Sequence, residues 1–217
     1  AAGLRLAYAL AANIGVGLIL PLWLIRAQLA SARGTPADFG LSGPGRRWAS
    51  LAAAAAAGYG VFRLGYRQPV DAGVLLHAFA QTWVVSAAEV AVCWALVGAA
   101  LRMTLRPWSQ AGSALLAAAA ASALFGVYHF AHSPPFNEPR MVVFLAGVGL
   151  ATSAWWLASR DILGTAVFHN FFAVTGVLGA LEGGALAPAA PVMVTALAAA
   201  ALLSWPAIRW SRGAGHA

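Results

Sequence analysis

Long apolar runs, separated by short polar connections rich in Gly, Pro and Arg, occupy most of this sequence. The runs are continuous rather than alternating, which favours helices over strands, and most reach the roughly 20 residues that cross a bilayer. The pattern predicts an all-α, polytopic membrane helix bundle of about seven transmembrane helices, forming a single domain over residues 1–217. The predicted spans are 6–25, 48–64, about 83–103, 109–132, 140–157, 162–181 and 188–208.

The apolar run over residues 72–103 is longer than one bilayer crossing requires. We expect a short interfacial helix that carries His77 as a structural residue, followed by a span that starts near Trp83. An acidic residue, Glu89, then falls in the first third of that span.

The composition supports a membrane protein. The chain is 61% hydrophobic and 9% charged, whereas ordinary soluble domains carry about 25% charged residues. All 13 basic residues are arginines, and they stand mostly singly between apolar runs, which is typical of topology signals rather than of a nucleic-acid surface. The expected surroundings are therefore membrane lipids, with no nucleic-acid partner. The single cysteine, Cys93, excludes an intrachain disulfide.

The arginines are distributed unequally between the two sides of the predicted bundle. The less basic side receives 4 arginines and the other receives the remaining 9. Because positive residues stay in the cytoplasm, we expect the N-terminus outside and the C-terminus inside the inner (cytoplasmic) membrane of a bacterium. The arginines of the less basic side are Arg5, Arg63, Arg67 and Arg140.

Glu89 and three histidines place ionisable groups at membrane depth. A carboxyl group there costs roughly 2.5–3.5 kcal/mol on insertion scales, so it marks a functional site by default. His129 and His132 close the fourth run and share one helical face, because they are three residues apart. His169 lies in the sixth run. We expect Glu89, His129 and His169 to converge around a polar cavity, where burial would suit Glu89 to act as a general base.

The stretch Phe125-Gly-Val-Tyr-His129 resembles the Phe-x-x-x-His motif of the CPBP family of intramembrane glutamic proteases. This family includes CAAX-prenyl endopeptidases, bacteriocin-processing proteins and myxosortase-like enzymes. The resemblance covers roughly residues 83–175, with an acidic residue one helix earlier and a histidine later, in the family's order. It implies a CPBP-like core and a metal-independent endopeptidase without cofactors, which cleaves a membrane-associated peptide or protein.

The same resemblance implies roles for individual residues. Glu89 would be the general base and His129 its partner in activating a water molecule. His169 would donate a hydrogen bond to the oxyanion, with Asn170 as a companion. The accessory residues would be Tyr128 and His132.

Two departures from the family pattern support a second hypothesis. The family's first motif is Glu-Glu-x-x-x-Arg, but Ala88 precedes Glu89 here and no arginine follows at that spacing. The third motif is His-x-x-x-Asn, but Ala173 stands four residues after His169. Asn170 is adjacent to His169, so the two side chains diverge by about 100° on a helix. The chain would then be a catalytically silent scaffold or an assembly subunit of a membrane complex.

A third hypothesis is a metal or haem site built from His129, His132 and His169, with Glu89 as a carboxylate ligand. Imidazole and carboxylate together suit zinc or iron.

Overall fold

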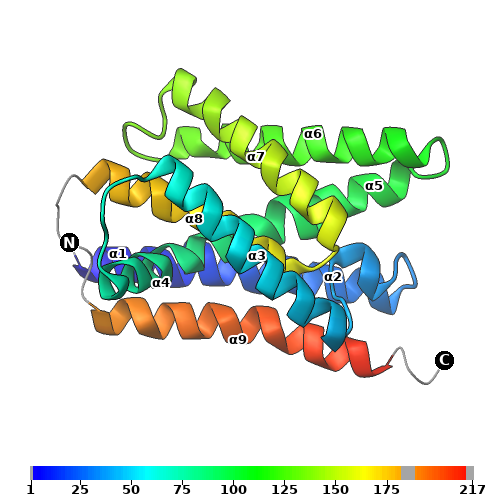
Figure 1. Cartoon of the computed structure of the whole chain (residues 1–217). Coiled ribbons are helices and arrows are strands. Elements are labelled where there is room, and N and C mark those ends of the chain that lie inside the picture. Colours follow the sequence, from blue (N-terminus) through cyan, green and yellow to red (C-terminus); the bar gives the residue numbers. More distant parts are fainter. Residues whose placement is uncertain (1, 182–188, 214–217) are drawn as a thin grey trace.

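The structure is a computed structural model that describes residues 2–181 and 189–213, and every regular element in this part of the chain is a helix (Figure 1). The first rod runs without interruption through α1, the π-type segment η1 and α2. A short connection with the single turn η2 then leads into α3. The bounds are α1 Ala2–Tyr8, η1 Ala9–Ile19, α2 Leu20–Ala30, η2 Pro36–Phe39 and α3 Pro44–Gly65.

A single long rod follows, made of α4 (Ala72–Glu89), η3 (Val90–Gly98) and α5 (Ala99–Leu105). The expected break between an interfacial helix and a span is therefore wrong. Neither proline nor glycine occurs between residues 74 and 97, so nothing in this run interrupts helical hydrogen bonding. The rod begins at Ala72 because the Asp71 carboxylate accepts hydrogen bonds from two backbone N–H groups of the first turn. Its helix widens to π geometry directly after Glu89.

The remaining rods are α6 (Gln110–Tyr128) with the single turn η4 (His129–Ala131), α7 (Pro139–Ser159), α8 (Ile162–Leu181) and α9 (Ala189–Gly213). Ser109 caps α6 through the Gly112 N–H, at 3.0 Å. Asp161 caps α8, because its Oδ1 accepts a hydrogen bond of 2.7 Å from the Gly164 N–H at the start of that helix. Successive rods run in alternate directions, so the bundle has two ends (Figure 1).

Small residues let α3 pack closely on α8. The buried face of α3 repeats every four residues through Ser50, Ala54 and Gly58. A Cβ atom added to Gly58 would collide with the Phe171 ring, so glycine is required at this crossing. Most of the alanine run 52–57 is exposed, and only Ala54 of that run is fully buried.

Within residues 2–181 and 189–213, five helices are long and apolar enough to cross a membrane, which identifies the fold as a helical membrane bundle: Leu6–Ala30, Ala72–Leu105, Gln110–Ala131, Pro139–Ser159 and Ile162–Ala180. The α3 helix contains three arginines, and the apolar segment of α9, Ala189–Trp205, is shorter than these five helices. The count of seven spans stays a prediction. Large apolar side chains are exposed on the outer surface, as a lipid environment allows; they include Leu115, Leu116, Val143, Phe144 and Leu197.

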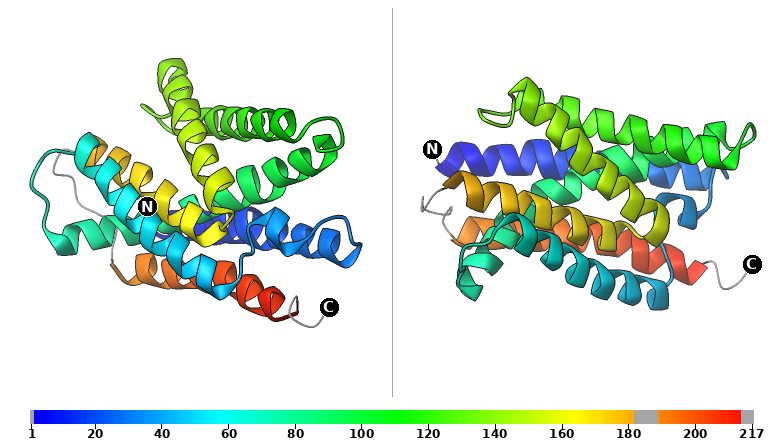
Figure 2. Two further views of the ribbon diagram at one scale, coloured as in Figure 1. Left: turned by 45° about the vertical axis from the view of Figure 1, so that its right-hand side comes forward. Right: turned by 45° about the horizontal axis from the view of Figure 1, so that its top comes forward.

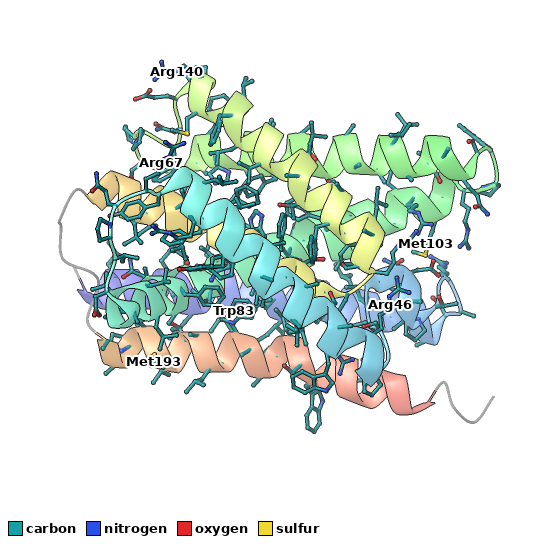
Figure 3. All side chains as sticks on the ribbon, viewed as in Figure 1. Arg46, Arg67, Trp83, Met103, Arg140 and Met193 are labelled. Carbon is teal, nitrogen blue, oxygen red and sulfur yellow. The ribbon has the colours of Figure 1, made fainter. Side chains whose placement is uncertain are left out.

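Polar residues gather at the two ends of the bundle. Figure 3 shows Arg67 and Arg140 at one end and Arg46 at the other. At the end that holds Arg46, α7 and α8 join through a tight turn in which Arg160 adopts a left-handed conformation with φ of 50°. From this turn the two helices diverge toward the opposite end (Figure 2).

Trp155 and Trp156 lie next to each other near the end of α7 but differ in their surroundings. Trp156 is buried and packs on Gly40, whose φ of 70° and close contact with the indole both require glycine. Trp155 is half-buried and its ring stacks on Phe168 at 4.6 Å between centroids. Both contacts form because the turn after Ser159 folds α8 back against this part of α7.

Candidate functional site

Glu89, His129 and His169 meet in the half of the bundle where α7 and α8 diverge. Glu89 is the last residue of α4, His129 the first of η4, and His169 lies in the middle of α8. His169 Nε2 is 3.1 Å from Glu89 Oε2, and His129 Nε2 is 3.9 Å from Glu89 Oε1. All three side chains are buried. The predicted convergence of these residues is confirmed.

The hydrogen bonds around His169 determine where its protons lie. The Thr152 hydroxyl donates to the Val148 carbonyl at 3.1 Å, so it accepts from His169 Nδ1, which is 2.9 Å away. His169 Nε2 is in turn hydrogen-bonded to Glu89 Oε2. Both ring nitrogens of His169 therefore have protein partners. The expected oxyanion role would need one of these hydrogen bonds to break, so His169 is better placed to hold Glu89.

The backbone carbonyl of Phe125, the first residue of the Phe-x-x-x-His motif, orients the His129 ring. Its Nδ1 lies 2.8 Å from the Phe125 carbonyl oxygen, which can only accept, so Nδ1 carries a proton. In the neutral ring, Nε2 then presents its lone pair toward Glu89. The Phe125 ring contacts both imidazoles edge to face, at 4.6 Å from His129 and 4.9 Å from His169. Phe125 thus fixes the spacing between the two histidines.

The position before Glu89 faces a neighbouring helix rather than the site. A Cβ atom placed on Gly17 of η1 would lie 2.5 Å from the Ala88 Cβ, so these two small residues form a close helix crossing. A glutamate at position 88 would have no room in this contact. Glu89 is therefore the acid that the fold directs into the site, in spite of the departure from the Glu-Glu pattern.

The other sequence candidates occupy different surroundings. His132 lines the site, its ring stacks on His129 at 4.9 Å, and its Nε2 is buried without a hydrogen-bond partner among the described residues. Tyr128 is half-buried, and its ring is nearly perpendicular to the imidazole rings of His129 and His132 that it contacts. Asn170 points elsewhere, and its Nδ2 donates to the Phe79 carbonyl of α4 at 2.9 Å. The structure thus brings His132 to Glu89 and leaves Asn170 between helices.

A cavity of about 500 Å³ opens from Glu89 between α7 and α8. Its polar wall consists mainly of Glu89 and the histidines, whereas most of its lining is apolar, so the expectation of a polar cavity was wrong. The turn after η4 contributes Pro135 and Phe136 to the lining. The remaining lining comes largely from one stripe of α7 and the C-terminal half of α8, including Met141, Phe144, Leu145, Val148, Phe172 and Gly176.

A second buried polar cluster lies at the opposite end of the bundle and was missed in the sequence. Asp161 accepts a hydrogen bond from Ser42 Oγ and lies 4.0 Å from Arg47 Nε, and Arg47 Nη2 donates to the Ser42 carbonyl at 2.6 Å. Burial raises the pKa of the Asp161 carboxyl, against the opposing effects of these hydrogen bonds and the Arg47 charge. Because the arginines between apolar runs were interpreted as topology signals, the sequence did not point to a buried role for Arg47.

Comparisons with models of protein families, with curated proteins and with solved structures found no match to this chain.

Proposed function

We propose that this chain is an intramembrane endopeptidase of the CPBP type, in which Glu89 and His129 activate a water molecule. The proposal is carried by one observation, the 3.9 Å separation between Glu89 Oε1 and His129 Nε2 in a buried site that opens into a cavity. This distance is too long for a direct hydrogen bond, but one water molecule can hydrogen-bond to both atoms.

The surrounding hydrogen bonds prepare Glu89 for this role. His169 holds Oε2, which leaves Oε1 directed toward His129 and the cavity. In the proposed reaction the water oxygen forms a bond to the peptide carbonyl carbon while a water proton passes to Glu89. The C–N bond then breaks, and the proton is delivered to the leaving amine. His169 acts as a positioning residue through Glu89, and Thr152 in turn positions His169.

The cavity suggests what kind of substrate would bind. Its volume lies within the range of about 300–1,000 Å³ that is typical of small-ligand sites. The largely apolar lining favours an apolar segment of a membrane-associated peptide, and the divergence of α7 and α8 offers an approach from the lipid side. On the predicted orientation, the site would lie in the outer half of the membrane.

The test is hydrolysis by the purified protein, residues 1–217, in liposomes. A library of membrane-inserting peptides is incubated in ¹⁸O-labelled water, and products are identified by mass spectrometry through ¹⁸O in the new carboxyl group. Loss of a general base lowers rates by about 10²- to 10⁴-fold, so Glu89→Gln should lose activity to that extent. The matched control, His77→Gln, changes a histidine of α4 outside the site and should cleave like the wild type.

Two outcomes contradict the proposal. If the Glu89→Gln variant cleaves peptides at the wild-type rate, Glu89 is not the general base. If the wild-type protein cleaves no peptide of the library, the hypothesis of a silent membrane-complex subunit is favoured instead, and co-purification with partners at fixed stoichiometry is its own test.

A further inference from the structure

His132 adds a third potential metal ligand to Glu89 and His129. One donor atom from each of these residues lies within 4.8 Å of the donor atoms of the other two. His132 follows His129 by one turn of η4, and the two imidazole planes are inclined by only 24°. The side chains are therefore already gathered on one side of the cavity, without a change in the helices.

The hydrogen bonds of His129 and Glu89 leave one atom of each side chain, Nε2 and Oε1, available to bind a metal ion. His129 Nδ1 is held by the Phe125 carbonyl, which directs Nε2 toward Glu89 Oε1. Glu89 Oε2 is held by His169, which in turn is held by Thr152. Metal sites in proteins commonly show this arrangement, in which the second ring nitrogen of a ligating histidine and the second oxygen of a carboxylate are hydrogen-bonded to the protein.

The hydrogen bonds of the described residues do not account for the burial of His132 Nε2. It is buried, and it has no hydrogen-bond partner among the described residues. A buried ring nitrogen without a partner is unfavourable by about 1–3 kcal/mol in general, so most such groups in proteins are paired. A bound cation would give this imidazole a partner.

We propose that Glu89, His129 and His132 form a three-ligand site for a divalent transition metal of the size of Zn²⁺. Donors at about 2.0–2.1 Å from a tetrahedral zinc ion are separated by about 3.3 Å, so the 3.9 Å between His129 Nε2 and Glu89 Oε1 needs only a small contraction. Two imidazoles and one carboxylate suit zinc better than Mg²⁺ or Ca²⁺, which prefer oxygen ligands. The fourth coordination position would face the cavity.

The same geometry argues against the haem hypothesis. Axial haem ligands lie on opposite sides of the iron, whereas His129 and His132 stack side by side on one wall of the cavity. The metal would occupy the gap between Glu89 and His129 that the proposed hydrolytic water needs, so metal binding and metal-free hydrolysis would exclude each other. The metal site does not require the proposed activity and could equally exist in a silent subunit.

The test uses untagged, chelator-treated protein in detergent and titrates it with Co²⁺, a spectroscopic substitute for Zn²⁺. We expect one Co²⁺ per chain, with the visible absorption of a tetrahedral site, and its loss on addition of Zn²⁺. His132→Asn should abolish this band. His169→Gln should weaken the affinity for Co²⁺ by about 10- to 100-fold, because the imidazole that hydrogen-bonds to Glu89 Oε2 is lost. His77→Asn, the matched control, should keep the wild-type spectrum.

Far-UV circular dichroism and gel filtration establish that each variant is folded. Absence of a tetrahedral band in the wild-type protein at saturating Co²⁺ overturns the proposal, whatever the variants do. A band that survives in folded His132→Asn overturns the assignment of His132 as a ligand. Neither result bears on hydrolysis, which is decided by the Glu89→Gln experiment.

Discussion

The Asp161 carboxyl, between α7 and α8, allows the effect of hydrogen bonding to be separated from the effect of charge. It is 1% exposed, accepts hydrogen bonds from Ser42 Oγ and the Gly164 N–H, and lies 4.0 Å from Arg47 Nε. Because burial raises the pKa of this carboxyl in spite of Arg47, loss of solvation outweighs the attraction to the guanidinium. We therefore expect the two hydrogen bonds to Asp161, rather than its attraction to Arg47, to stabilise the turn between α7 and α8.

Substitution by asparagine and by alanine distinguishes these contributions. Asp161→Asn keeps Oδ1, which can accept from the Gly164 N–H, and its Nδ2 can donate to the Ser42 hydroxyl oxygen, whereas Asp161→Ala leaves both buried groups without a partner. Each unpaired buried polar group costs about 1–3 kcal/mol, so alanine, which leaves two of them, should lower the free energy of unfolding by about 2–6 kcal/mol more than asparagine does. The measurement is equilibrium unfolding in dodecylmaltoside–SDS mixed micelles, followed by far-UV circular dichroism.

Asp71 provides a matched control, since it caps α4 by accepting a 2.7 Å hydrogen bond from the Gly73 N–H at an exposed position. Replacing an exposed cap by alanine costs typically about 1 kcal/mol, so the difference between alanine and asparagine should be smaller here. If Asp161→Asn is as destabilising as Asp161→Ala, the reasoning is refuted and attraction to Arg47 dominates.

The pH dependence gives an independent check. A folded-state pKa raised above the ordinary value of 3.8 means that the folded chain binds more protons than the unfolded chain. The associated stabilisation is fully present below pH 3.8 and is lost as the pH rises through the pKa of Asp161 in the folded chain. The free energy of unfolding of the wild type, relative to that of Asp161→Asn, should therefore fall as the pH rises through this window. A difference that rises with pH would contradict the raised pKa.

Two further predictions concern the candidate site and its nearest helix crossing. Thr152→Val removes the acceptor for the buried His169 Nδ1–H and should destabilise the protein by about 1–3 kcal/mol, with Thr152→Ser restoring most of the loss in the same unfolding assay. Gly17→Ala places a Cβ 2.5 Å from the Ala88 Cβ and should cost about 1–3 kcal/mol by overpacking. Adding Ala88→Gly should recover most of that cost, and an unchanged stability of the double variant relative to Gly17→Ala would disprove the contact.

The sequence alone was sufficient for the fold class and for most helix boundaries. Continuous apolar runs can satisfy their backbone hydrogen bonds in a membrane only as helices, so the runs predict the rods directly. Caps such as Asp161 are local, because the side chain bonds to backbone two or three residues away. Glu89, His129 and His169 stood out because charged and polar groups at membrane depth are costly enough to be rare.

The tertiary structure decided what these residues do. Helical spacing says which residues share a face but not which face meets which helix. Only the packed bundle showed that Ala88 points at Gly17, that Thr152 holds His169, and that Asn170 bonds to the α4 backbone instead of entering the site. The partnership of Arg47 with Asp161 joins residues more than a hundred positions apart, and nothing local in the sequence marks it. Such contacts depend on how the helices cross, which is determined by side-chain packing over the whole bundle.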